Sequence, residues 1–337
     1  HKAILISMGH PAFNDPIQTT MPDKLIAVLP TPVQPYLDDK LPEWLGVRWF
    51  KSTEEACALA PEADIGWFDM PQKPDMAAAI SLATRMKWLN SALAGMDGLP
   101  LDLLQQRGAI VTNGAGINAI AVAEYVVMGM LNIAKNYREV VRAQDRHEWL
   151  RDSPGKVELA GSRALMVGYG AIGKMVEERL KAFGVKVTAV RRNADASGET
   201  LGPDQWKDRL GEFDWVILAV PATGETEHMI GGAELARMKP QAVLMNFARG
   251  SIVDQEALVA ALENKRIAAA FLDVSDPEPL PSGHPLWRLD NVHISMHLSG
   301  RSQTRMFERA ADRFLDNLAR FHAGEPLQFK VDLNTGY

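Results

Sequence analysis

Short apolar runs alternate along the chain with segments in which apolar residues recur at helical spacing. From Met21 onward this pattern predicts strand, helix, strand, helix and strand in turn, at Lys24–Leu29, Val33–Lys40, Val47–Phe50, Thr53–Leu59 and Asp64–Phe68. Two further strands are expected at Lys87–Ser91 and Ala109–Thr112. Because strands that alternate with helices are joined by crossover connections, the pattern predicts a parallel sheet.

The turn Asn113-Gly114-Ala115-Gly116 follows the last of these strands and marks the first expected domain boundary. A long apolar helix, Ala119–Arg142, is predicted to lead away from it, and its largely apolar surface favours burial between domains or between subunits. A second alternating series begins at Ser162, with strands expected at Ala164–Val167, Val185–Val190, Trp215–Val220, Ala242–Phe247, Ala268–Val274 and Val292–Met296. Six strands in this order are typical of a doubly wound dinucleotide-binding domain.

Chain length supports a division into two domains, because 337 residues exceed what one hydrophobic core usually serves. A final helix, Ser302–Ala323, follows the last strand and is expected to return to the first domain. We therefore predict a first domain of residues 21–118 and 300–337 and a dinucleotide-binding domain of residues 119–299. Met21 has the position of a natural start, so residues 1–20 are expected to be an extension of uncertain origin.

Composition and charge exclude several classes of protein. The net charge of -6 offers no basic surface for nucleic acid or for an anionic membrane. The most apolar stretch, Ile117–Ala134, contains Asn118, Glu124 and Asn132, which favours a buried helix over a membrane span. The only cysteine, Cys57, excludes an internal disulfide and a multi-cysteine metal site and is typical of the reducing cytoplasm. We predict a cytoplasmic protein without a bound metal.

A glycine-rich turn is the first candidate for chemistry. Gly168, Gly170 and Gly173 fit the pattern G-x-G-x-x-G, and Tyr169, Ala171 and Ile172 fill the positions between them. The first glycine permits a tight turn, the second lets backbone N–H groups approach a pyrophosphate, and the third allows close packing of helix on strand. The motif alone is weak, because glycine turns after strands are common. Its place between a predicted strand and a predicted helix favours a dinucleotide site at a helix N-terminus.

Two arginines, Arg191 and Arg192, end the next strand, where a site that prefers NAD would carry an acidic residue for the ribose 2′-hydroxyl. Guanidinium groups form charged, bidentate hydrogen bonds with phosphate. The pair therefore predicts NADP(H) as the preferred cofactor, with NAD(H) as the second choice. The alternative interpretation is a solvated basic loop.

Three further signals follow predicted strands, at whose carboxyl ends ligands bind in open α/β sheets. Arg249 is suited to binding a carboxylate and polarising a carbonyl, and Gly250 beside it would let a ligand approach. Glu278 lies between two prolines, which suits an orienting carboxylate, and His297 is suited to general acid catalysis. Taken singly, Arg249 would more often form a surface salt bridge and His297 would more often be a core histidine. His293 is interpreted as structural.

With these motifs in order, the chain resembles the D-isomer-specific 2-hydroxyacid dehydrogenases, and most of all those that reduce glyoxylate and hydroxypyruvate with NADPH. The resemblance runs from about Met21 to the C-terminus. It implies a Rossmann cofactor domain, a flavodoxin-like substrate domain, a homodimer and a small 2-keto or 2-hydroxy acid substrate. In such a protein Arg249 would bind the substrate carboxylate and carbonyl, His297 would be the acid/base, and Glu278 would be its partner.

The resemblance also implies contacts outside this set. The segment from Leu93 to Asp97 looks like the family's substrate loop, with the backbone N–H groups of Ala94 and Gly95 on the carboxylate. Asp273 would contact the nicotinamide carboxamide. Further cofactor contacts are implied at Val220, Pro221, Thr226, Ala248, Ser299 and Gly300.

The sequence departs from the family pattern at Met296, where a proline usually precedes the histidine, and at Leu298 and Arg301, which are bulkier or more charged. These changes leave the size of the substrate open, so a bulkier keto acid such as phenylpyruvate is an alternative. A corepressor-like protein that senses the dinucleotide without turnover is the rival from another class. Formate- or phosphite-oxidising relatives are disfavoured, because the former usually pair their histidine with glutamine, whereas Glu278 is present here, and both normally run in the oxidative direction with NAD.

Overall fold

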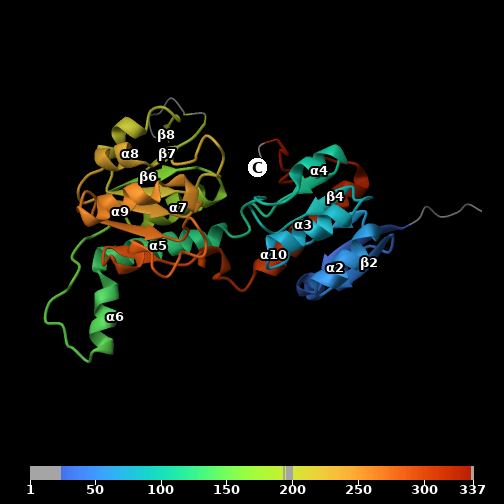
Figure 1. Cartoon of the computed structure of the whole chain (residues 1–337), viewed down its shortest axis with the longest axis horizontal. Helices are drawn as coiled ribbons and strands as arrows, with labels where there is room; N and C mark the ends of the chain where they lie inside the picture. The colour runs from blue at the N-terminus through green and yellow to red at the C-terminus, as the bar shows by residue number, and fades with distance from the viewer. Residues whose placement is uncertain (1–23, 193, 195–199, 335–337) are drawn as a thin grey trace, which may run out of the picture.

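The computed structural model describes residues 24–192, 194 and 200–334, and two lobes account for all of them (Figure 1). The expectations for residues 1–20 and for Met21 lie outside the described residues. Each lobe is built on its own parallel sheet, one of five strands and one of seven. The prediction of two α/β units with parallel sheets is confirmed.

The five-stranded sheet has the order β2-β1-β3-β4-β5, with every pair parallel. This is the flavodoxin-like order, as the resemblance implied. Its strands are β1 (Leu25–Pro30), β2 (Leu45–Phe50), β3 (Ile65–Gly66), β4 (Trp88–Asn90) and β5 (Ile110–Thr112). The helices of this lobe are α1 (Gln34–Leu37), α2 (Thr53–Leu59), α3 (Lys73–Leu82), α4 (Leu101–Gln106) and α10 (Met306–Ala323).

The seven-stranded sheet has the order β12-β11-β10-β9-β6-β7-β8, again with every pair parallel. Its strands are β6 (Arg163–Val167), β7 (Lys186–Val190), β8 (Thr200–Leu201), β9 (Trp215–Leu218), β10 (Val243–Asn246), β11 (Ala269–Leu272) and β12 (Val292–Ile294). The order reverses between β6 and β9. In open parallel sheets this reversal opens a crevice at the carboxyl ends of the strands, where ligands bind.

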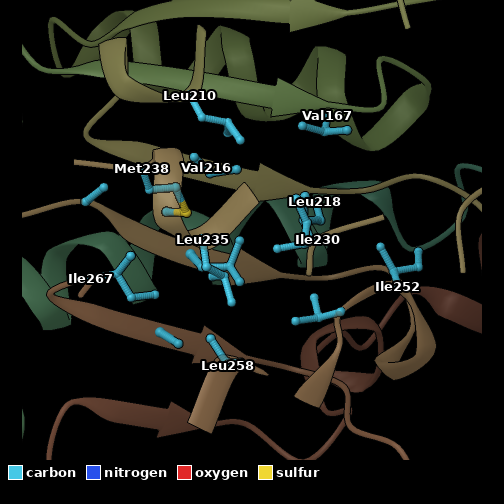
Figure 2. Packing of buried hydrophobic residues seen from close by; sticks show 14 of the residues in the cluster. Val167, Leu210, Val216, Leu218, Ile230, Leu235, Met238, Ile252, Leu258 and Ile267 are labelled. Carbon is cyan, nitrogen blue, oxygen red and sulfur yellow. The ribbon is translucent and has the colours of Figure 1, made fainter. Parts of the chain in front are cut away.

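Apolar side chains cover both faces of the larger sheet. Leu165 and Val167 of β6 face one cluster, while Ala164 and Met166 face the other, as the period of two in a strand requires. Figure 2 shows the first cluster, in which Leu235 of α8 (Gly232–Arg237) and Leu258 of α9 (Gln255–Glu263) pack on the sheet. The second cluster lies under α5 (Ala119–Lys135) and α7 (Ala171–Ala182).

The helix expected at Ala119–Arg142 is two helices, α5 and α6 (Tyr137–Asp145). Asn136 separates them with φ of 44°, and asparagine tolerates this left-handed conformation better than most residues do. The buried face of α5 covers the larger sheet of its own lobe, whereas burial between domains or between subunits was expected; a subunit interface at this helix stays a prediction. A Cβ at Gly129 would lie 2.8 Å from the ring of Phe271, so the helix lies directly on β11. α6 and the segment that follows it extend away from the lobe (Figure 1).

The helix expected at Ser302–Ala323 begins only at Met306. The residues before it are held in a turn, since the Gln303 side chain donates to the Gly300 carbonyl at 2.9 Å and to Asn118 Oδ1 at 2.7 Å. The two segments that join the lobes therefore touch each other. α10 returns to the smaller sheet as expected, where the Phe314 ring stacks on Trp88 at 5.2 Å.

Smaller differences concern short elements. The expected helix Val33–Lys40 is one turn of α-helix between two 3-10 turns, because Pro35 cannot donate a backbone hydrogen bond. Helices α3, α4, α8 and α9 and strand β8 were not located from the sequence. The 3-10 helices are η1 (Thr31–Val33), η2 (Asp38–Lys40), η3 (Ala60–Glu62), η4 (Lys207–Glu212), η5 (Gly250–Ile252), η6 (Pro285–Arg288) and η7 (Ser299–Arg301).

Candidate active site

The glycine-rich turn lies at the reversal of strand order, between the ends of β6 and β9. Gly168 has φ of 102°, and a Cβ there would lie 2.4 Å from the Ala219 carbonyl oxygen. A Cβ at Gly173 would meet the Gly168 carbonyl oxygen at the same distance, so α7 sits directly against the turn. Gly170, the residue before α7, faces open space. The backbone N–H groups of the first residues of α7, which include Ala171 and Ile172, can therefore donate hydrogen bonds to a phosphate.

Arg191 and Arg192 lie at the end of β7, and both are exposed. The Arg191 guanidinium lies 5.5 Å from the centre of the Tyr169 ring, which comes from the glycine turn itself. The Tyr169 hydroxyl donates to Glu177 of α7, and this hydrogen bond with the carboxylate raises the pKa of Tyr169 to about 12. A fixed phenol thus holds one arginine beside the phosphate-binding turn, which fits a dinucleotide with a 2′-phosphate.

The loop after β9 carries three more of the expected cofactor residues. Val220 and Pro221 are half-buried in it. The Thr226 hydroxyl donates to the Pro221 carbonyl at 2.7 Å and accepts from the Thr223 backbone N–H at 2.8 Å. The hydroxyl of Thr226 therefore holds the loop closed.

The three strands that precede the catalytic candidates are neighbours in the sheet, in the order β12, β11 and β10. Arg249 follows β10, Glu278 lies in the loop after β11, and His297 follows β12. The His297 Nδ1 atom lies 2.8 Å from Glu278 Oε2. The structure thus brings together an imidazole and a carboxylate that are far apart in the sequence.

The carboxylate of Glu278 is held in its charged form. Burial acts to raise its pKa, but the hydrogen bond from His297, the charges of His297 and Arg249, and the backbone N–H of Ser275 outweigh burial and lower the pKa below its ordinary value. Arg249 is therefore close enough to act on the same pair. All three side chains are partly exposed, so a small molecule can reach them.

Gly250 has a role other than the one expected of it. It is buried, and a Cβ there would lie 2.1 Å from the Ser275 carbonyl. The glycine lets the loop that carries Arg249 pass against the loop that carries Glu278, instead of leaving room for a ligand. Ala248 is also buried, and its carbonyl accepts from Arg249 Nη1 at 2.8 Å, which fixes the direction of the guanidinium.

Asp273 is buried beneath the histidine loop. Its carboxylate accepts from the Ser295 hydroxyl at 2.7 Å, from the Ser299 backbone N–H at 3.2 Å and from the Ser299 hydroxyl. The His297 backbone N–H donates to the Asp273 carbonyl. These contacts on either side of His297 define the loop. The loop then reaches Gly300, which packs against Asn118. A Cβ at Gly300 would lie 3.2 Å from the side-chain amide nitrogen of Asn118.

The backbone of the histidine loop is strained. Met296 and His297 have φ of 52° and 56°, in the left-handed region that costs most residues about 1 to 3 kcal/mol. A proline at position 296 could not adopt this conformation, because its ring would fix φ near about -65°. The Asp273 contacts supply the restraint that keeps the strained conformation.

The candidate substrate loop lies against the catalytic arginine. Gly95 is buried, and a Cβ there would lie only 2.1 Å from Arg249 Nη2, while Ala94 beside it is exposed. Asp97 of the same loop accepts from Arg249 Nε at 3.2 Å and lies 3.6 Å from Lys73 Nζ. The sequence interpretation gave Asp97 no role and missed Lys73.

Asp69 is a second residue that the sequence interpretation missed. Its carboxylate accepts from the Ser91 hydroxyl and the Ala92 backbone N–H, both at 2.6 Å, and from the Trp67 indole at 2.8 Å. Burial raises the pKa of Asp69 above its ordinary value, although the three hydrogen bonds act to lower it. It anchors the start of the substrate loop. The sequence did hold a signal for Asp69, because this carboxylate comes directly after the strand expected at Asp64–Phe68.

His293 lies apart from the Glu278–His297 pair. Its ring stacks on Phe271 at 6.3 Å, and burial, together with the charges of Arg138 and Arg142, lowers its pKa to about 4. The ring is therefore neutral near pH 7, which fits the structural interpretation.

Two further findings concern the described residues alone. Their His, Cys, Asp and Glu side chains form no group of three that could hold a metal ion. Among their helices, none combines the length and apolar character needed to cross a bilayer.

Comparison with protein families shows that residues 127–299 match the NAD-binding domain of the D-isomer specific 2-hydroxyacid dehydrogenases. The chain is 35% identical over 283 residues to the glyoxylate reductase of Aeropyrum pernix, an alignment that covers 81% of this chain and 84% of the relative. It is also 35% identical over 259 residues to the D-3-phosphoglycerate dehydrogenase of Methanocaldococcus jannaschii, which covers 75% of this chain. The chain spans about half the length of that relative, 49%.

Solved structures of similar proteins share the whole fold. A D-isomer specific 2-hydroxyacid dehydrogenase family protein from Aeromonas salmonicida superposes with a TM-score of 0.82 at 27% identity, covering 93% of this chain and 100% of that one. A D-isomer specific 2-hydroxyacid dehydrogenase from Xanthobacter autotrophicus, solved with NADPH and MES, gives a TM-score of 0.74 at 25% identity, covering 94% and 100%.

Proposed function

Because the chain belongs to the D-isomer-specific 2-hydroxyacid dehydrogenase family, we propose that it reduces a small 2-keto acid, such as glyoxylate or hydroxypyruvate, to the D-2-hydroxy acid with NADPH. The observation that carries this proposal is the 2.8 Å contact between His297 Nδ1 and Glu278 Oε2, with Arg249 beside the pair. A dinucleotide whose pyrophosphate is held at the glycine turn would supply the hydride from its reduced nicotinamide ring. The remaining tasks fall to side chains of this chain.

His297 is the proton donor in this proposal. The Glu278 carboxylate accepts a hydrogen bond from Nδ1–H, which leaves Nε2 to carry the proton for the substrate. Before the reaction, the charged Glu278 stabilises the imidazolium form of His297. As negative charge develops on the substrate carbonyl oxygen, His297 donates its proton to that oxygen. After the reaction the ring takes its proton back from solvent, to which it is partly exposed.

Arg249 binds and activates the substrate. Its guanidinium has donors for the substrate carboxylate and for the carbonyl oxygen, where it stabilises the developing alkoxide. The backbone N–H groups of Ala94 and Gly95 complete the carboxylate site, since Gly95 lies directly against Arg249 Nη2. Loss of NADPH absorbance upon addition of glyoxylate or hydroxypyruvate tests the activity. Dinucleotide binding without turnover of any 2-keto acid would instead support a sensor.

The cofactor preference rests on Arg191 and Arg192. We expect Arg191→Asp to lower kcat/KM for NADPH by about 10- to 100-fold, because the 2′-phosphate loses a charged hydrogen bond and meets a like charge. NADH has no such phosphate, so its kcat/KM serves as the internal control and should change by less than about 3-fold. Steady-state kinetics with both cofactors measures this. An equal loss with both would exclude Arg191 from phosphate recognition.

The proposal includes a homodimer. Apolar side chains gather on the surface of α6 and the segment after it, where Trp149 is 94% exposed and Tyr137 and Val157 are each 55% exposed. We expect Trp149→Glu to weaken the dimer by about 2 kcal/mol or more, as replacement of a central aromatic residue does in other interfaces. Light scattering across a dilution series measures the dissociation. Phe183→Glu, an exposed aromatic residue just after α7, is the control, and an unchanged mass for Trp149→Glu at every concentration would contradict the assignment.

A further inference from the structure

A cavity of about 650 Å³ lies beside the substrate loop. The loop residues Met96–Leu99, the first turns of α4, the loop after β9 and the C-terminal segment line it, and it is open to solvent. Its lining residues are Met96, Asp97, Gly98, Leu99, Pro100, Leu101, Asp102, Leu103, Gln106, Ala222, Leu333 and Asn334. Ala222 belongs to the lobe of the larger sheet, so both lobes contribute to the wall.

Asp97 links this cavity to the proposed reaction centre. Asp97 lines the cavity, and the same carboxylate accepts from Arg249 Nε at 3.2 Å. A Cβ at Gly95 would lie 2.9 Å from Asp97 Oδ2 and 2.1 Å from Arg249 Nη2. A keto acid bound by Arg249 and the Gly95 N–H would therefore lie next to Asp97, which lines the cavity.

Apolar and polar groups share the wall about equally. Its apolar part comes from the buried Met96 and from Leu99, Leu101, Leu103 and Leu333. Glyoxylate has no carbon side chain and would leave this space filled with water. A substrate with an alkyl or aromatic side chain would remove apolar surface from water, which increases kcat/KM by roughly 3- to 4-fold for each buried methylene.

The charged groups in the wall are carboxylates, Asp97 and Asp102. Of the described residues that line the cavity, none is a lysine or an arginine. Lys73 Nζ lies 3.6 Å from the Asp97 carboxylate and Arg249 Nε lies 3.2 Å from it, so each of these cations already faces a carboxylate. A second carboxylate on the substrate side chain would meet like charge and find no cation of its own.

We propose that this cavity receives the side chain of the keto acid and that it disfavours dicarboxylic substrates, because Asp102 lies in its wall and the cations beside Asp97 are already paired. The preferred substrate is then a monocarboxylic 2-keto acid with several side-chain carbons that end in a neutral or cationic group. The inference rests on the proposed function and narrows its substrate class.

Kinetics with two sets of keto acids test the inference. Along pyruvate, 2-oxobutanoate, 2-oxopentanoate and 2-oxohexanoate, kcat/KM should rise by about 10- to 50-fold in total. The five-carbon pair 2-oxopentanoate and 2-oxopentanedioate differs by one carboxylate, and the first should be preferred by about 100-fold or more. A flat series, or equal use of the pair, overturns the inference while glyoxylate or hydroxypyruvate reduction still supports the proposed function. Failure to reduce any keto acid overturns both.

A matched pair of variants tests the role of charge. Asp102→Asn should lower the preference for 2-oxopentanoate over 2-oxopentanedioate by about 5-fold, because one repulsive charge is removed. Asp102 is chosen because Asp97 also contacts Arg249. Asp39→Asn removes an exposed carboxylate outside the cavity and should leave the preference unchanged. An equal change in both variants, or none in Asp102→Asn, overturns the charge selection.

Discussion

Replacing His297 by alanine is expected to lower kcat by about 10²- to 10⁴-fold, the range that a positioned general acid contributes. Alanine removes the proton donor and leaves Glu278 without its partner at 2.8 Å. The backbone of the loop should persist, because the Asp273 carboxylate holds it through Ser295 and Ser299. Stopped-flow or steady-state kinetics at saturating keto acid and NADPH measure the loss, and circular dichroism checks the fold.

The control for this prediction is His293→Gln. His293 lies on the strand that leads to His297 but is neutral near pH 7, since burial and the charges of Arg138 and Arg142 lower its pKa to about 4, and it stacks on Phe271. Its replacement should change kcat by less than about 3-fold, because a neutral ring held in packing transfers no proton. If a folded His297→Ala enzyme keeps near-normal turnover, or if His293→Gln loses as much, His297 is not the acid.

Much of the fold could be predicted because both sheets are parallel and buried on both faces. Such strands read as continuous apolar runs, and the predicted β6 and β10 differ from the structure by one residue at each changed end. The break between α5 and α6 at Asn136 could not be predicted from the hydrophobic pattern, because the sequence on both sides of Asn136 is compatible with one continuous helix. Short elements such as β8 are set by pairing with a neighbour and not by their own pattern.

The sequence predicted those residues of the candidate site that come after the ends of predicted strands. Arg249 and His297 each come soon after a predicted strand, and the parallel sheet then places them at one edge. Asp97 could not be assigned, because its partner Arg249 is brought to it only by the arrangement of the two lobes. Gly250 was misinterpreted because its close neighbour Ser275 belongs to another loop of the same lobe, and the sequence does not show which loops touch.

Arg249→Gln is expected to lower kcat/KM for the keto acid by about 10³-fold or more. This loss is comparable with the one expected for His297→Ala. The variant loses a charged, bidentate carboxylate contact and one donor to the developing alkoxide, and a single such donor is worth about 10² to 10³ in kcat. Both KM for the keto acid and kcat should therefore worsen. KM for NADPH should change little, because the cofactor residues lie at the glycine turn and at Arg191.

Arg249→Lys separates charge from geometry. Lysine keeps the positive charge but cannot offer two parallel donors, so its kcat/KM should fall between the native enzyme and Arg249→Gln. Arg48→Gln, which removes an exposed partner of Glu62 on the smaller lobe, is the control and should have near-native kinetics. A loss confined to NADPH binding, or an Arg249→Gln enzyme with native KM for the keto acid, would show that Arg249 does not bind the substrate carboxylate. The Asp97 carboxylate, which now accepts from Arg249 at 3.2 Å, would then be the arginine's main partner, and its role would be to join the lobes.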